Sequence, residues 1–175
     1  MSDPNNMNDA MAKWVAACTP GDHHKRMEAF AGTWDMTRIM NCGSPDGKPV
    51  ESKGHAVKRI ILGGRWLVDE TKGEFMGQPH ESISYLGYDN FRKRYVGSYI
   101  DNLSTMLFTS VGGADADGRV FCAFGTMDEP MTGEVQKYIR YVAKIVDADT
   151  HTFEIYSADC VPERLVQEIT YRRVK

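Results

Sequence analysis

The sequence contains 175 residues, 42% of them hydrophobic and 26% charged, which is ordinary for a single soluble globular domain. Its formal net charge of -3 argues against a nucleic-acid partner, because nucleic acids bind basic surfaces. No segment approaches the ~20 apolar residues that a membrane helix requires. The polar N-terminus also lacks the pattern of a secretory signal, so we expect a cytoplasmic protein without a membrane partner.

The N-terminal segment predicts helices. Residues 1–6 are polar, and we expect them to form a disordered tail. Residues 7–17 predict a helix, because apolar residues recur on one face, and a second short helix is expected at 23–31. Short helices before a β domain commonly cover one end of it, so residues 7–31 are interpreted as an N-terminal helical segment in that position. The apolar residues of the first helix are Met7, Met11, Trp14 and Val15.

The rest of the chain, residues 32–175, predicts strands. Short segments rich in β-branched and aromatic residues alternate with polar residues, and turn signals such as Gly63-Gly64 and Asp89-Asn90 separate them. The short connections require antiparallel pairing, since parallel strands need long crossovers. About ten strands are expected, at 32–41, 51–62, 65–75, 81–88, 94–101, 104–111, 119–127, 136–146, 151–157 and 165–174.

Ten strands favour a closed sheet. An open twisted sheet of this size tends to curl or split, and closure also removes the exposed edges. We therefore predict a mainly β protein, with a single antiparallel up-and-down barrel and a short N-terminal helical segment. A β-sandwich is the alternative, although it usually brings longer Greek-key connections.

Several motifs resemble a known family. Gly32-Thr33-Trp34 follows a short helix, and Tyr171-Arg172-Arg173 lies in the last strand. Further motifs are Gly63-Gly64-Arg65 with Leu67, Leu86-Gly87-Tyr88-Asp89, and Asp101 followed by Ser104-Thr105-Met106. Together they resemble the bacterial domain-of-unknown-function family 1579 from about residue 22 onward. The resemblance implies a lipocalin-like (calycin) barrel in a bacterial protein, and it implies no activity.

In lipocalin-like barrels the tryptophan of the Gly-x-Trp motif closes one end, and a basic residue of the last strand packs over it. By this resemblance Trp34 closes the barrel, which requires the first and last strands to pair. Arg172 and Arg173 have opposite parity, so only one of them lies over the indole. We predict that this residue is Arg173, which shares a face with Tyr171 and Ile169.

Strand parity also selects candidate residues for the lumen. If Trp34 points inward, alternate residues of its strand do so too. On the central strands either the face with Trp66 or the face with Tyr99 is a candidate, and bulges could invert both assignments. The predicted ligand-binding residues are Trp34, Met36, Arg38, Trp66, Glu70, Tyr99, Asp101 and Met106.

This mixture of methionine, aromatic and a few charged side chains is typical of a ligand pocket. We therefore predict that the barrel binds a small hydrophobic or amphipathic molecule, largely apolar and bearing a polar group. Two alternatives stay open: an enzyme that acts on a similar molecule, and a packed barrel that acts through its surface or as a homodimer. In the packed case Met36 and Met106 are simply core, and Asp101 is a cap for the turn at its strand end.

The sequence offers no signature of catalysis or metal binding. The five histidines show no HxH or HExxH spacing, and we expect each of them at the surface. The four cysteines form no CxxC pair and are expected to be free thiols, and no GxSxG motif is present. We predict no metal site and assign neither a catalytic residue nor a cofactor. A carboxylate of Glu70 or Asp101 that meets a histidine or a hydroxyl outside a salt bridge would favour an enzyme.

Overall fold

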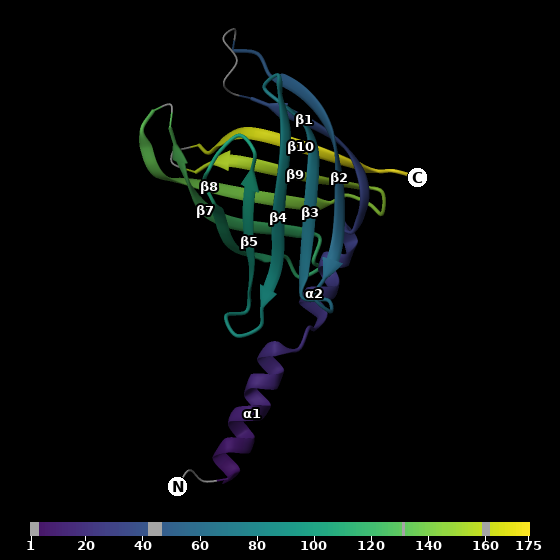
Figure 1. Ribbon diagram of the computed structural model, residues 1–175, viewed down its shortest axis with the longest axis vertical. Coiled ribbons are helices and arrows are strands. Elements are labelled where there is room, and N and C mark those ends of the chain that lie inside the picture. The colour runs from purple at the N-terminus through teal and green to yellow at the C-terminus, as the bar shows by residue number, and fades with distance from the viewer. Residues whose placement is uncertain (1–3, 42–46, 131, 159–161) are drawn as a thin grey trace.

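A computed structural model describes residues 4–41, 47–130, 132–158 and 162–175, with side chains from residue 7 onward. Ten antiparallel strands form one closed barrel in which each strand pairs with its neighbours in the sequence, and β1 pairs with β10 (Figure 1). The prediction of a mainly β, up-and-down barrel is confirmed. The strands are β1 Gly32–Met40, β2 Val50–Ile61, β3 Trp66–Phe75, β4 Gln78–Asp89, β5 Arg94–Asp101, β6 Phe108–Ala114, β7 Val120–Glu129, β8 Glu134–Ile145, β9 Thr150–Ser157 and β10 Arg164–Arg173.

The predicted strand boundaries differ most at β6, which begins at Phe108 instead of residue 104. Asp101 explains the delay, because its carboxylate accepts the backbone N–H groups of Leu103 at 2.9 Å and Ser104 at 2.8 Å and so holds a turn there. Gly112, one residue beyond the predicted end of this strand at residue 111, lies within β6. A Cβ at this position would lie 2.0 Å from the carbonyl oxygen of Cys122, so only glycine permits the approach of β7.

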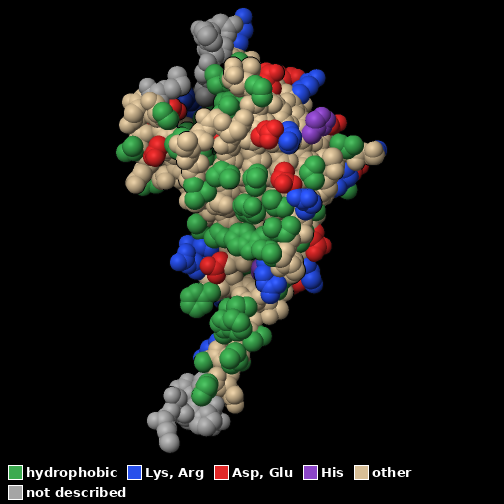
Figure 2. Space-filling view, viewed as in Figure 1, with side chains coloured by type: hydrophobic (Ala, Val, Ile, Leu, Met, Phe, Trp, Pro, Cys, Tyr) green, Lys and Arg blue, Asp and Glu red, His purple; other side chains and the backbone are tan. Residues whose placement is uncertain are grey.

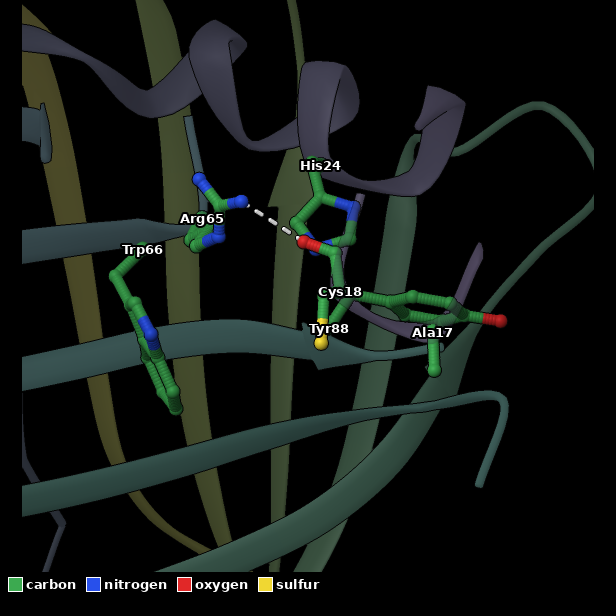
Figure 3. Close-up of a pocket in the computed structure, with 6 residues that line it drawn as sticks. All are labelled: Ala17, Cys18, His24, Arg65, Trp66 and Tyr88. Carbon is green, nitrogen blue, oxygen red and sulfur yellow. Dashed lines mark hydrogen bonds between the residues drawn. The ribbon is translucent and has the colours of Figure 1, made fainter. Parts of the chain in front are cut away.

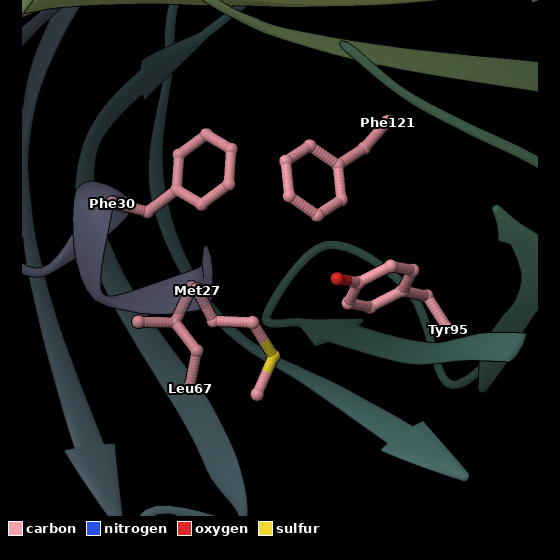
Figure 4. Close-up of a cluster of buried hydrophobic side chains, with 5 residues drawn as sticks. All are labelled: Met27, Phe30, Leu67, Tyr95 and Phe121. Carbon is pink, nitrogen blue, oxygen red and sulfur yellow. The ribbon is translucent and has the colours of Figure 1, made fainter. Parts of the chain in front are cut away.

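The second and third helical elements close one end of the barrel. α2 (Asp22–Arg26) leads directly into the 3-10 helix η1 (Met27–Phe30). Met27 and Phe30 are buried, and they pack against Leu67, Tyr95 and Phe121 from three strands (Figure 4). We call this the helical end of the barrel. The opposite end, which carries the β3–β4 turn and the β5–β6 loop, is called the distal end.

The first helix, α1 (Pro4–Cys18), does not cover the barrel but projects away from its helical end (Figure 1). The expectation that the helical segment covers one end is therefore met by α2 and η1 only. The helix begins at Pro4, before the predicted start at residue 7, while residues 1–3 lie outside the described residues. Its apolar side chains are largely exposed: Met7 61%, Met11 58%, Trp14 64% and Val15 48%.

Two barrel side chains fasten the C-terminal end of α1. Arg65 donates from Nη2 to the carbonyl oxygen of Cys18 at 2.9 Å. Asn90 donates from Nδ2 to the carbonyl oxygens of Ala17 at 3.2 Å and Thr19 at 2.7 Å. The last carbonyls of a helix have no partner within the helix, so these bonds both cap α1 and fix its position on the barrel.

Cys18 and Cys122 are free thiols, whereas Cys42 and Cys160 lie outside the described residues. Among the helices that the structure describes, none has the length and apolar character needed to cross a bilayer.

Candidate functional site

The interior of the barrel holds polar as well as apolar residues. On β4, His80 and Ser82 are buried, whereas Ile83 and Tyr85 on the opposite face are more than a third exposed. The first half of the strand therefore turns polar residues inward and large apolar residues outward, whereas Leu86 and Tyr88 in its second half pack against the interior cluster. Figure 2 shows hydrophobic side chains gathered over α1 and across the neighbouring outer face of the sheet. The interior polar groups form two clusters, one toward each end.

Arg38 on β1 is the central residue of the cluster toward the distal end. Its side chain is only 5% exposed, and it donates from Nη1 to the carbonyl oxygen of Glu74 at 3.1 Å. Its Nε is buried without a hydrogen-bond partner among the described residues. The guanidinium carbon lies 5.2 Å from the centroid of the Phe75 ring. The chain thus buries a cation and leaves one of its donors unused.

A chain of hydrogen bonds lies beside Arg38. Nε2 of His80 is 2.9 Å from the hydroxyl oxygen of Tyr99, and the side chains of Asp101 and Ser82 lie close enough to this hydroxyl to influence its pKa. A carboxylate only accepts, so a Tyr99 O–H that points toward Asp101 goes with the His80 tautomer whose Nε2–H donates to the Tyr99 oxygen. In this tautomer Nδ1 of His80 is a bare acceptor. It is buried and has no partner within the described part of the chain.

The environment sets the charges of this cluster. Burial, followed by the positive charge of Arg38, lowers the pKa of His80 below its usual 6.5, so the imidazole is neutral at pH 7. Burial and the nearby Asp101 raise the pKa of Tyr99 well above its usual value, so it stays a phenol. Burial also lowers the pKa of Arg38, but a guanidinium remains charged at neutral pH.

Apolar side chains surround this polar cluster. The Phe75 ring lies 5.9 Å from the ring of His80, and the Phe108 ring lies 5.9 Å from that of Tyr99. Phe108 and Met106 also line a hollow of about 200 Å³ at the distal end, whose lining includes the polar residues Thr109, Thr126, Asp128 and Gln136. The turn and loop of this end carry further exposed apolar side chains: Met76, Leu103 and Leu107. A polar centre therefore lies beneath an apolar rim.

The second interior cluster lies toward the helical end and is centred on Lys58. Its Nζ is 3.0 Å from Oδ2 of Asp69, 3.1 Å from Nε2 of His151 and 3.7 Å from the centroid of the Tyr171 ring. The His151 ring stacks on Tyr171 and meets Trp34 edge-on. Burial and the charges of Lys58 and Arg173 lower the pKa of His151 to about 2. This neutral imidazole accepts from the Lys58 ammonium at Nε2, while its Nδ1 is buried without a partner among the described residues. Because Lys58 is paired with Asp69 and the rings pack on one another, the cluster has the character of a packed core.

The structure divides the predicted site residues into three groups. Arg38, Tyr99 and Asp101 come together in the distal cluster, and Met106 lies at the hollow beside it. Trp34 and Met36 are buried in an apolar cluster with Ala56, Ile169 and Tyr171, so these two are core in this structure. Trp66 and Glu70 lie on the outer face. Glu70 pairs there with Arg59, and the Trp66 ring covers Gly87, where a Cβ would lie 2.6 Å from it.

Sequence reasoning missed His80 and Ser82, and it wrongly placed His24, His80 and His151 at the surface. All three histidines are at most 6% exposed. The signal that could have revealed His80 is parity, because it shares a face of β4 with Ser82 and Ser84, next to the strand of Tyr99 and Asp101.

A separate hollow of about 180 Å³ lies where α1 joins the barrel. Ala17, Cys18, His24, Arg65, Trp66 and Tyr88 line it, and the Arg65–Cys18 hydrogen bond crosses it (Figure 3). Its polar groups already fasten α1, so it has the features of a structural junction. Within the described ranges, no group of three histidine, cysteine or acidic residues is arranged to hold a metal ion.

Comparisons with known proteins support the fold. A family model described as a protein of unknown function (DUF1579) matches residues 19–173, and no curated protein matches the sequence. The crystal structure of Rv2717c from M. tuberculosis is 14% identical, with a TM-score of 0.63 over 90% of this chain and 100% of that chain. One redesigned β-barrel is 12% identical, with a TM-score of 0.44 over 86% of this chain and 96% of that chain. Another, bound to DFHBI, is 14% identical, with a TM-score of 0.43 over 85% of this chain and 98% of that chain.

Proposed function

The chain belongs to the family DUF1579, as its motifs predicted, and we propose that it binds a small, largely apolar molecule with a polar group in the distal half of the barrel. The observation that carries this proposal is that Nε of Arg38 and Nδ1 of His80 are buried without hydrogen-bond partners among the described residues. Leaving such atoms unsatisfied costs roughly 1–3 kcal/mol each, so a ligand that pairs with them gains affinity. The family itself is without an assigned activity.

The surroundings fit an amphipathic molecule. The polar group would meet Arg38 and His80, while its apolar part lies against the rings of Phe75 and Phe108. Ligand pockets usually combine an apolar lining with a few convergent polar groups. The hollow, at about 200 Å³, is below the roughly 300–1,000 Å³ of sites for drug-sized ligands, which favours a small molecule.

Native mass spectrometry of the protein as purified from cells tests this proposal. A retained small molecule is expected as added mass that disappears after denaturation. The matched variants are Arg38→Met, inside the barrel, and Arg59→Met, one strand away on the outer face. Loss of the added mass in the first variant and its retention in the second support the proposal, whereas equal retention in both places the molecule elsewhere.

A second candidate function is self-association through α1. The residues Met7, Met11, Trp14 and Cys18 follow the 4-3-4 spacing of a coiled-coil seam, and all are exposed. An isolated 15-residue helix is marginally stable in water, so this face is expected to pack on another helix. A membrane surface suits it less, because such helices are rich in basic residues and α1 carries only Lys13. The partner we propose is α1 of a second copy.

An enzyme acting on a similar molecule is the third candidate. Asp101 lies close enough to the Tyr99 hydroxyl to raise its pKa, and this hydroxyl lies 2.9 Å from Nε2 of His80. A neutral imidazole with a bare nitrogen is suited to act as a general base. Turnover of the retained molecule, followed by mass spectrometry, would then be lost in His80→Gln, which keeps a donor to Tyr99.

A cytoplasmic location stays a prediction.

A further inference from the structure

We infer that the polar group of the lumenal ligand is a carboxylate, held between Nε of Arg38 and Nδ1 of His80. This inference rests on the proposed binding function and specifies the chemical class of the ligand. It follows from three features of the distal cluster: the buried charge of Arg38, the unused Nε–H of the same side chain, and the imidazole of His80.

The charge comes first. The Arg38 guanidinium is 5% exposed, and no ion pair joins it to an acid in the described ranges. Asp101 is near enough to influence it, but the Asp101 carboxylate already accepts from the backbone N–H groups of Leu103 and Ser104. A buried cation is unfavourable unless an anion pairs with it. One negative charge on the ligand would supply that pairing.

The available donors fit a planar monoanion. Nη1 of Arg38 is occupied by the carbonyl oxygen of Glu74, which leaves the Nε–H free for an oxygen approaching from the side of the guanidinium. Carboxylates accept in this geometry from arginine. A phosphate dianion would bring a second negative charge, for which the cluster holds no second fixed cation among the described residues. The carboxylate is therefore the better match.

His80 adds a proton to this recognition. Its Nε2 contacts the Tyr99 hydroxyl, so protonation at the unpartnered Nδ1 creates a new N–H on an imidazole that the charge of Arg38 influences. The groups that face the imidazole are Arg38 on β1, Phe75 on β3, and Tyr99 and Asp101 on β5. Arg38 opposes protonation while its charge is uncompensated. A bound carboxylate removes this opposition, so binding is expected to take up one proton.

Access requires a small movement, since both unused nitrogen atoms are covered in this structure. Phe75 is the side chain in position to move, because its ring lies over Arg38 and beside His80. It is the last residue of β3, directly before the turn at Met76 and Gly77. Displacing this ring would expose both atoms without opening the sheet.

The test compares three probes with the same chain length: octanoate, octan-1-ol and octyl phosphate. Isothermal titration calorimetry on the full-length protein gives each Kd at pH 7. We expect octanoate to bind at least tenfold more tightly than either of the others. Arg38→Met is expected to abolish this preference, and the outer-face control Arg59→Met to retain it. Circular dichroism checks that both variants are folded. The comparison of the three probes on the wild-type protein does not depend on either variant.

The pH dependence isolates His80. A carboxylic acid with a pKa of roughly 4 is fully ionised between pH 6 and 8, so any change in affinity belongs to the protein. Octanoate affinity is expected to fall as the pH rises over this range in the wild type and to stay level in His80→Gln. A level profile in the wild type would overturn the role of His80.

The remaining outcomes separate this inference from the function on which it rests. If octan-1-ol binds as tightly as octanoate, or octyl phosphate binds more tightly, the carboxylate assignment is wrong while lumenal binding stands. If none of the three probes binds, the proposed binding function itself is contradicted. A preference for octanoate that survives Arg38→Met places the carboxylate at another site and overturns the inference.

Discussion

The guanidinium carbon of Arg173 lies 4.1 Å from the centroid of the Trp34 ring, and the two residues are direct partners in the register of β1 and β10. This contact confirms the prediction that Arg173, and not Arg172, lies over the indole. Trp34 also donates from Nε1 to the carbonyl oxygen of Phe30 at 2.9 Å. The contact thus joins the first strand, the last strand and η1 at the helical end.

Trp34→Ala is expected to lower the free energy of unfolding by ~3–5 kcal/mol, because the indole is only 1% exposed and its removal leaves a cavity. Arg173→Ala should be milder, at ~1–3 kcal/mol. Its cation–π contact contributes ~0.5–1 kcal/mol. Hydrogen bonds to the carbonyl oxygens of Ala31 and Ala148 add to it. Urea denaturation measures both variants, and equal, small losses would contradict the role of Trp34 in closing the barrel.

Two ion pairs on the same pair of strands permit a controlled comparison of burial. Lys58–Asp69 faces the interior and Arg59–Glu70 faces outward. Lys58→Met is expected to lower the free energy of unfolding by ~3–5 kcal/mol, because Asp69 then keeps a buried, unpaired charge. Arg59→Met should change it by ~0–1 kcal/mol, as is usual for exposed pairs. Thermal and urea melts check the contrast, and similar losses from both would show that the interior cluster is hydrated.

His151 makes stability depend on pH. Its pKa is about 2 in the folded protein against about 6.5 in the unfolded chain, so the unfolded state binds more protons between these values. Stability therefore rises with pH through this window and is level with respect to His151 above it. Below pH 6.5 the contribution changes by ~1.4 kcal/mol per pH unit at most.

The variant His151→Gln keeps an acceptor for Lys58 and removes the titration. Relative to wild type, it is expected to lose less stability between pH 7 and pH 5, by ~1–2 kcal/mol in urea melts. The same slope in both proteins would mean that His151 is protonated in the folded state and that its contact with Lys58 is not maintained.

The strand pattern was enough to predict a ten-stranded barrel, because its brief turns permit only antiparallel neighbours. It did not predict which faces point inward. On β3, the rule that apolar residues face the core favoured Trp66, yet the interior holds Asp69 and Thr71. Asp69 is inside because Lys58 pairs with it across the sheet. Such a pair joins residues on different strands, and periodicity within one strand cannot reveal it.

The distal cluster shows the same limit. Parity placed Arg38 correctly, because Trp34 fixed the inward face of β1. It could not bring His80 to Tyr99, since their contact depends on the register between β4 and β5. The position of α1 could not be predicted from periodicity either. An apolar helix face indicates that the face packs against something, but it does not identify the partner.

The last prediction concerns self-association through α1. Met11→Glu places a charge in the centre of the exposed seam and is expected to convert a dimer into a monomer. Ala16→Glu introduces the same side chain on the opposite face of the helix and is the matched control. Size-exclusion chromatography with multi-angle light scattering measures the mass of wild type and both variants. The dimer is expected in wild type and in Ala16→Glu only.

Cys18 gives this test a second readout, because it is exposed at the end of the seam. In an antiparallel pair of α1 helices, Met7 of one copy faces Cys18 of the other. Met7→Cys is therefore expected to form an intermolecular disulfide with Cys18 under mild oxidation, which non-reducing electrophoresis detects, whereas Asp9→Cys on the opposite face is not. A wild-type protein that stays monomeric at high concentration and forms no such cross-link would rule out the seam as a dimer contact.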